Sequence, residues 1–228
     1  MTSAEKPVDS AENPAAPADY RLLLPEGWFR ILLDPDQRNR SVDALVERQF
    51  HGIDNAPHLK EELRADLRRR AAKAHRSGGI ELYLSLQEVG PFTIPASLLV
   101  SLAPLRHAEP LPAEDLARAF AEDAEEAGPG EAPEITVEEL AAGTAVRVRR
   151  LSRQPGENGP DGGPGGGPGG GPGGGPGGEH VSVSVEYHLP VPGTTAFLLL
   201  TFSTPLEPIA DAMAGLFDAI AGSLTWTE

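Results

Sequence analysis

The sequence contains no cysteine. This absence excludes disulfide bonds, a cysteine nucleophile, a thiolate zinc site and an iron–sulfur cluster. Long apolar runs are also missing, since the longest, residues 196–200, is far too short to cross a bilayer. No apolar run follows the first methionine, so we expect no signal peptide. These absences predict a cytoplasmic protein with no membrane span.

Basic residues are scarce. The chain has 19 lysines and arginines against 34 acidic residues, a formal net charge of -15 and a pI of about 4.8. Binding to the phosphate backbone of a nucleic acid requires a surplus of positive charge. We therefore expect no nucleic-acid partner.

Glycine and proline are concentrated in one internal segment. Residues 155–178 hold 15 of the 26 glycines and 6 of the 23 prolines. Such a composition cannot bury an apolar face and predicts a disordered loop. Residues 1–19 form a polar, Pro/Ala-rich stretch that predicts a disordered tail. The remainder, residues 20–228, is expected to be a single domain interrupted by the 155–178 loop.

Hydrophobic periodicity predicts an alternation of short strands and helices. Period-two patterns indicate strands and 3.6-residue patterns indicate helices. The expected order is a hairpin, two helices, a hairpin, a helix, a hairpin, two more strands and a helix, at residues 20–33, 35–77, 80–102, 112–127, 134–152, 180–202 and 209–224. Short turns between neighbouring strands require antiparallel pairing. We therefore predict an α+β fold in which an antiparallel sheet is sandwiched between helices, with an added helical pair at 35–77.

Three C-terminal segments resemble the C-terminal half of PsbP-like domains. They are the Ala-Gly-Thr-Ala-Val-Arg-Val-Arg run at 142–149, the hairpin at 181–204 and the final helix, which leads into Ser-Leu-Thr-Trp at 223–226. The PsbP-like fold, found in photosystem accessory proteins and Ran-binding import factors, is an antiparallel sheet between helical layers. The resemblance covers about half of the chain and implies a non-catalytic accessory or binding role. The helical pair has no counterpart in it.

Sequence motifs for catalysis or cofactor binding are absent. The six histidines show no HExxH or HxH spacing. No GxSxG nucleophile elbow is present, and the glycine-rich segments lack the Lys-Ser/Thr of a phosphate-binding loop. We therefore expect no enzyme, no metal site and no cofactor.

Charge is unevenly distributed along the chain. Residues 109–139 are strongly acidic, whereas the second helix carries a basic cluster, consisting of Lys60, Arg64, Arg68, Arg69, Lys73 and Arg76. We consider these six residues a candidate interaction surface for a charged protein partner. Two other interpretations stay open, namely a solvated face that keeps the protein soluble and a contact between the acidic and basic segments.

Two functional hypotheses follow. The first is a non-catalytic protein-interaction or accessory module. The second is a small-ligand binding domain, or an enzyme without recognisable motifs, with a pocket between the sheet and the helical pair. Oligomeric state is not predicted by the sequence.

Two packing relationships are also predicted. We expect strands 144–152 and 181–189 to be antiparallel neighbours, with Arg147 beside Glu186 and Val148 facing Val185. We further expect Phe217 of the last helix to be almost wholly buried.

Overall fold

The structure is a computed structural model that describes residues 16–52, 55–89, 92–104, 111–126, 131–154 and 180–227. Its helices are α1 (Pro35–Gln49), α2 (Pro57–Arg76), α3 (Ala113–Glu126) and α4 (Ala210–Gly222), with a 3-10 turn at Glu207–Ile209. Its strands are β1 (Asp19–Arg21), β2 (Trp28–Leu32), β3 (Gly79–Val89), β4 (Phe92–Pro104), β5 (Glu134–Leu140), β6 (Gly143–Gln154), β7 (His180–Pro190), β8 (Ala196–Thr204) and β9 (Thr225–Thr227). The predicted 155–178 loop lies outside the described residues, as do residues 1–15 of the predicted tail.

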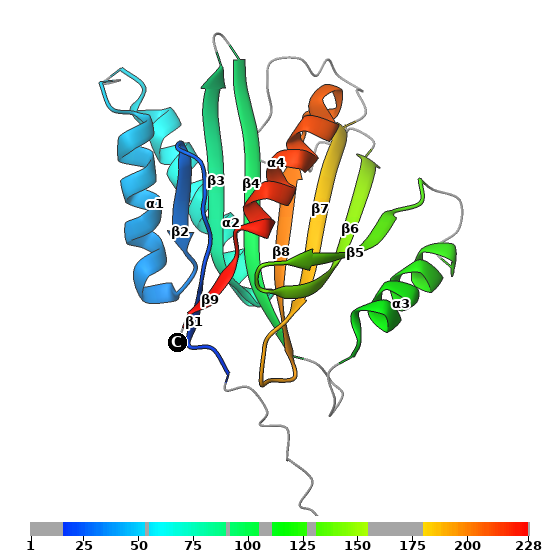
Figure 1. The fold of residues 1–228 in the computed structure, drawn as a ribbon. Helices are drawn as coiled ribbons and strands as arrows, with labels where there is room; N and C mark the ends of the chain where they lie inside the picture. The colour runs from blue at the N-terminus through cyan, green and yellow to red at the C-terminus, as the bar shows by residue number, and fades with distance from the viewer. Residues whose placement is uncertain are drawn as a thin grey trace, which may run out of the picture.

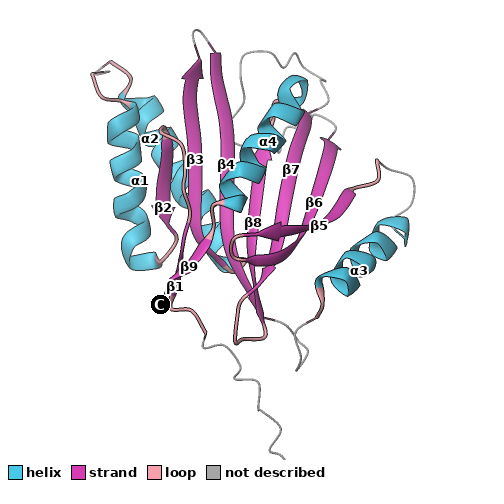
Figure 2. Ribbon diagram, in the orientation of Figure 1, coloured by secondary structure: helices cyan, strands magenta, loops and turns pink. Residues whose placement is uncertain are grey.

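Seven strands form one antiparallel sheet in the order β2-β3-β4-β8-β7-β6-β5. Figures 1 and 2 show α4 lying across the front of this sheet. The helical pair α1–α2 packs against β2 and β3, and α3 packs against β5 and β6. The predicted class, an α+β fold with an antiparallel sheet between helices and an added helical pair, is confirmed.

The main core lies between α4 and the front of the sheet. Met213, Phe217 and Ile220 of α4 are buried, and Phe217 is wholly inaccessible to solvent, as predicted. The Phe217 ring stacks on Phe202 of β8, with ring centroids 4.9 Å apart. Along β7, every second residue from Val183 to Leu189 is buried in this core, which is the alternation expected for a strand.

The back of the sheet has two smaller apolar clusters. Val42, Val46 and Leu67 of the helical pair pack against Ile31 and Leu84 of the sheet. At the opposite end, α3 contributes Leu116, Ala117 and Phe120, which pack on Val146, Val148 and Ile135. On strand β8 between these two clusters, Leu199 and Thr201 of the back face are only half-buried.

The prediction of a first hairpin is wrong. β1 pairs with β9 near the C-terminus, and β2 pairs with β3. β1 is held in this place by Glu81 of β3, whose carboxylate accepts hydrogen bonds from Tyr20 Oη at 2.7 Å and Tyr83 Oη at 2.6 Å. Burial raises the pKa of both tyrosines, so both hydroxyls remain donors at neutral pH. Side chains distant in sequence thus override the local turn signal.

The predicted pairing of β6 with β7 is confirmed, but its register is wrong by one residue. Arg147 lies opposite Tyr187, and Val148 lies opposite Glu186. A shift of one residue exchanges the two faces of a strand. Arg147 therefore points toward α4 on the front, while Glu186 on the back pairs with Arg150 at 3.1 Å.

No helix of the described residues is long and apolar enough to span a membrane.

Candidate functional site

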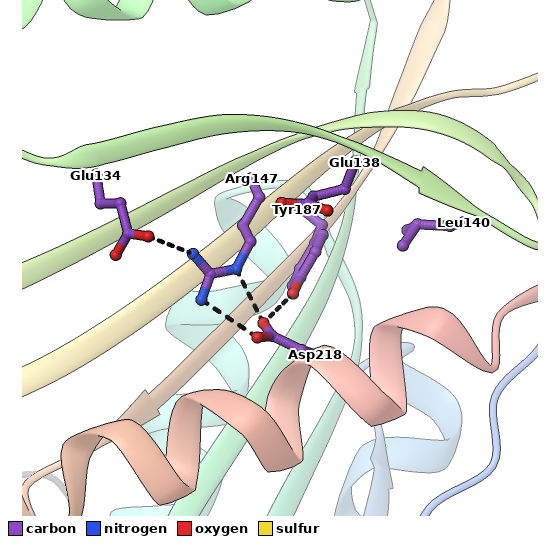
Figure 3. Close-up of a pocket in the computed structure, with 6 residues that line it drawn as sticks. All are labelled: Glu134, Glu138, Leu140, Arg147, Tyr187 and Asp218. Carbon is purple, nitrogen blue, oxygen red and sulfur yellow. Dashed lines mark hydrogen bonds and ion pairs between the residues drawn. The ribbon is translucent and has the colours of Figure 1, made fainter.

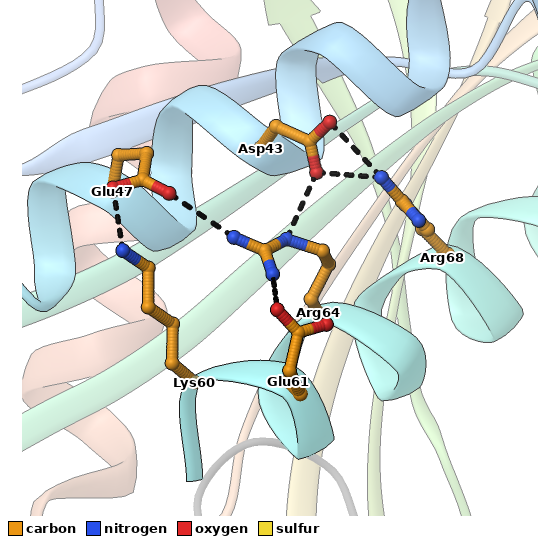
Figure 4. A network of polar contacts seen from close by, with 6 residues as sticks. All are labelled: Asp43, Glu47, Lys60, Glu61, Arg64 and Arg68. Atoms are coloured by element: carbon orange, nitrogen blue, oxygen red, sulfur yellow. Dashed lines mark hydrogen bonds and ion pairs between the residues drawn. The ribbon is translucent and has the colours of Figure 1, made fainter. Parts of the chain in front are cut away.

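The predicted basic surface on α2 is largely engaged in contacts with α1. Figure 4 shows Lys60, Arg64 and Arg68 reaching toward the acidic residues of α1. Lys60 Nζ lies 2.6 Å from Glu47, and Arg64 lies 3.1 Å from both Asp43 and Glu47. Only 14% of the Arg64 side chain is exposed. These ion pairs join the two helices, so the arginine spacing on α2 has an internal structural role.

The remaining residues of that surface are more accessible. Arg68 pairs with Asp43 at 2.7 Å, and exposed Arg69 pairs with Asp66 of its own helix at 2.6 Å. Lys73 and Arg76 are exposed and have no ion pair within the part of the chain that the structure describes. The acidic α3 is not among the ion-pair partners of α2 in this part of the chain. An interaction surface on α2 stays a prediction, and it concerns mainly Arg69, Lys73 and Arg76.

A pocket lies on the front of the sheet, at the end where β5, β6 and β7 meet α4. It has a volume of about 340 Å³. We call it the α4–β5 pocket, and its lining residues are Glu134, Glu138 and Leu140 of β5, Arg147 of β6, Tyr187 of β7 and Asp218 of α4. The pocket expected from the sequence, between the sheet and the helical pair, is a different place: the α4–β5 pocket lies at the other end of the sheet, on the face covered by α4.

Asp218 gathers the polar groups at the base of the pocket. Arg147 Nε donates to Asp218 Oδ1 at 2.9 Å, and Arg147 Nη2 donates to Oδ2 at 3.4 Å. The Tyr187 hydroxyl also donates to Asp218. Figure 3 shows Arg147 and Tyr187 extending side by side from the sheet toward the helix. Asp218 thus gives the buried guanidinium of Arg147 the partner that a buried charge requires.

The surroundings of Arg147 and Tyr187 determine the charge states of these two side chains. The Arg147 side chain is only 8% exposed. Burial lowers the pKa of Arg147, but the hydrogen bonds and charge interactions with Asp218 and Tyr187 together outweigh burial, and the net shift is upward. Burial, followed by the hydrogen bond to Asp218, raises the pKa of Tyr187. At neutral pH the arginine is therefore charged and the tyrosine is protonated.

The β5 side of the pocket is acidic and open to solvent. Glu134 lies 3.7 Å from Arg147 and 3.8 Å from Arg149, beyond hydrogen-bond distance, and 57% of its side chain is exposed. Glu138 accepts a hydrogen bond from Thr136 at 2.8 Å through Oε1. Three carboxylates against one guanidinium give the lining a formal charge of about -2.

Sequence reasoning missed all six residues of this pocket. Two signals were present in the chain. Asp218 is flanked by the buried positions of an apolar helix, and Arg147 stands between two valines in a strand. Either residue alone is common on a protein surface, so only the fold shows that the two meet.

Metal binding has no support in the described residues. They contain no group of three or more histidine, aspartate or glutamate side chains that could hold a metal ion.

The architecture is an α+β fold built on a seven-stranded antiparallel sheet. No family model matches the chain, and no curated protein matches it significantly. Among solved structures, the chain resembles LpqN of Mycobacterium tuberculosis, described as involved in cell envelope biogenesis, with a TM-score of 0.46 and 12% identity over 96% of this chain and 88% of that one. It also resembles PsbP (CyanoP) from Synechocystis sp. PCC 6803, with a TM-score of 0.41 and 12% identity over 96% of this chain and 98% of that one. Both are likenesses of fold alone.

Proposed function

We propose that this protein is a non-catalytic binding module that receives a group of a protein partner in the α4–β5 pocket. The observation that carries the proposal is a pocket of about 340 Å³ that is hydrogen-bonded at its base and open at its rim. The base is fixed by the hydrogen bonds of Arg147 and Tyr187 to Asp218. The rim is formed by Glu134, which is more than half exposed.

The chemistry of the lining supports binding rather than catalysis. General acid–base catalysis at neutral pH needs a group whose pKa lies near the working pH. Arg147 and Tyr187 both have raised pKa values and keep their protons. The lining contains no serine, histidine or lysine, and its remaining ionisable groups are three carboxylates, of which Asp218 is engaged by Arg147 and Tyr187.

Charge reversal at Glu138 tests the proposal. Affinity purification from the native organism would compare the wild-type chain with Glu138→Arg and with Glu139→Arg as a matched control. Glu139 is the next residue of β5, is exposed and accepts a hydrogen bond from Thr144 at 2.8 Å, outside the pocket. Both variants change the net charge equally.

We expect a protein partner that is retained by the wild type and Glu139→Arg but lost from Glu138→Arg. A partner set that Glu138→Arg retains in full contradicts the proposal. The cytoplasmic location of this protein, which is expected from its composition, is tested separately by cell fractionation.

A small free ligand is the second candidate, because a volume of about 340 Å³ falls within the range of small-molecule pockets. Native mass spectrometry of the purified chain separates the two candidates. A bound small molecule that Glu138→Arg removes, together with unchanged protein capture, favours the small-ligand function.

A further inference from the structure

The acidic groups of the α4–β5 pocket differ in how far their hydrogen-bonding capacity is used. Asp218 is engaged on both oxygens by Arg147, and on one also by Tyr187. Glu138 uses Oε1 to accept from Thr136, and its Oε2 has no hydrogen-bond partner among the described residues. Glu138 therefore keeps a free acceptor oxygen, as does the more exposed Glu134, while the donors of the pocket are already directed at Asp218.

An anionic ligand is disfavoured by this arrangement. The guanidinium of Arg147 is neutralised by Asp218, and Glu134 lies 3.7 Å from its Nη1. An incoming carboxylate or phosphate would have to displace one of these contacts and approach Glu138. A cation meets no such competition, because the lining has a formal charge of about -2.

The form of the acceptor selects among cations. A guanidinium is recognised best by both oxygens of one carboxylate, whereas an ammonium is a compact charge with three rotatable donors. On Glu138, which is less exposed than Glu134, one oxygen already accepts from Thr136 and the other has no partner among the described residues. The divalent-metal alternative lacks a suitable ligand group in the described residues. An ammonium group fits the single acceptor.

The remaining walls suit an aliphatic chain. Leu140 lies two residues beyond Glu138 on the same face of β5 and lines the pocket, and the Tyr187 ring forms part of its base. Methylene groups gain free energy when they cover such apolar surface while a charged end reaches a polar partner. The pocket thus combines an apolar wall with one carboxylate acceptor.

We propose that the α4–β5 pocket binds an alkylammonium group, supplied by a lysine side chain of the partner, with Glu138 as its anchor. This inference rests on the proposed function and names the chemistry of the same site. Glu134 lies four residues away on β5, about 13 Å along the strand. It acts at longer range and contributes less than Glu138.

The test is a titration of the full-length chain followed by ¹H–¹⁵N NMR. The probes are butylammonium chloride, sodium butyrate, butanol, putrescine and a short peptide with one lysine or, as its neutral counterpart, norleucine. We expect saturable binding of butylammonium and the lysine peptide at about millimolar concentration, as for ligands of few atoms. The shifts should centre on residues 138–140 and 187, and butanol, butyrate and the norleucine peptide should not saturate.

Three variants locate the site. Glu138→Gln should weaken binding up to about fivefold, and Glu134→Gln less than about twofold, as expected for a close and a distant partly exposed pair. Glu139→Gln should leave the affinity unchanged. Binding should also weaken between low salt and 0.5 M salt, on the order of the screening expected for exposed charges.

Several results would overturn the inference. They are the absence of saturable amine binding, an affinity that Glu138→Gln leaves intact, or tighter binding of butyrate than of butylammonium. Tighter binding of putrescine than of the lysine peptide would assign the ammonium to a free polyamine and reject the lysine side chain. Partner capture that depends on Glu138 without amine binding rejects only this inference, whereas amine binding without partner capture rejects the proposed function.

Discussion

Arg147 lies directly opposite Tyr187 in the β6–β7 ladder, and both side chains donate hydrogen bonds to Asp218 of α4. The same three residues therefore attach the last helix to the sheet and form the base of the α4–β5 pocket. A second pair, Arg149 with Asp211, repeats the arrangement about two helical turns away along α4. The two pairs differ in exposure, which allows their contributions to be separated by mutation.

Asp218→Ala should lower the free energy of unfolding by about 2 kcal/mol, because it leaves a buried guanidinium without its acceptor. The Arg147 side chain is 8% exposed, so water cannot fully replace Asp218. Asp211→Ala is the matched control on the same helix. Asp211 is 91% exposed, and its loss should cost less than about 1 kcal/mol. Urea denaturation of both variants measures the difference. Equal losses would show that the buried contact of Asp218 with Arg147 adds no more stability than the exposed contact of Asp211 with Arg149.

The fold could be predicted from sequence wherever one face of an element was apolar. The alternation in β7 indicated its buried residues Val183, Val185 and Tyr187, and the apolar stripe of α4 indicated Phe217. The first hairpin could not be predicted correctly. The predicted hairpin at 20–33 pairs residues that are close in sequence, but Tyr20 forms its hydrogen bond with Glu81, a residue 61 positions away.

The pocket could not be predicted because β6 has no distinct polar face. Val146, Arg147 and Val148 are all buried, since α4 covers one side of the strand and α3 the other. Matching arginines to the polar row of β7 therefore gave a register shifted by one residue, and placed Arg147 beside Glu186. The basic cluster on α2 was visible in the sequence, but its partners Asp43 and Glu47 lie on a separate helix.

The two tryptophans provide a second prediction. Trp226 Nε1 donates to the carbonyl of Ala142 in the β5–β6 turn at 2.8 Å, whereas Trp28 Nε1 is buried and has no hydrogen-bond partner among the described residues. Trp226→Phe should cost about 1 kcal/mol more than Trp28→Phe, because only the former breaks a hydrogen bond. Thermal unfolding compares the variants. A greater loss of stability for Trp28→Phe than for Trp226→Phe would show that differences in packing outweigh the hydrogen bond of Trp226.

A third prediction concerns pH. His188, at 3.6 Å, and Arg150, at 3.1 Å, hold the pKa of Glu186 below its usual value of 4.5. A lowered pKa in the folded state contributes stability that is present above about 4.5 and is lost as the pH falls through the lower, folded-state pKa. Glu186→Gln should therefore destabilise the protein at pH 7, by about 1 kcal/mol.

The difference between wild type and Glu186→Gln should shrink toward zero as unfolding is measured at successively lower pH. Glu139→Gln controls for the loss of one negative charge at an exposed position. A difference that stays constant from pH 7 to below the folded-state pKa would show that the amide acts through packing rather than through lost ionisation.

Deletion of residues 158–177 is the fourth prediction. Gln154 and His180 are paired at the end of the β6–β7 ladder. The deletion leaves five residues between them, 155–157 and 178–179, and hairpins commonly close over loops of four or five residues. Because the connection becomes five times shorter, stability should hold or rise by about 1 kcal/mol. Differential scanning calorimetry measures the stability of the deletion variant. A thermal midpoint lowered by several degrees would show that the deleted residues stabilise the fold.

The last prediction concerns Phe217. This side chain is wholly buried and stacks on Phe202 at a centroid distance of 4.9 Å. Phe217→Ala should cost about 3–5 kcal/mol, because it removes transfer free energy and leaves a cavity. That is a large share of the total stability of a domain, so the variant should be barely folded.

Leu216→Ala is the matched control, since Leu216 is the adjacent residue of α4 and is only half-buried. It should cost clearly less than Phe217→Ala in a chemical denaturation curve, because part of its side chain already contacts water. If α4 were instead an exposed docking helix, Phe217→Ala would keep the wild-type midpoint and lose only a partner. An unchanged midpoint would therefore contradict the placement of Phe217 in the core and the attachment of α4 to the sheet.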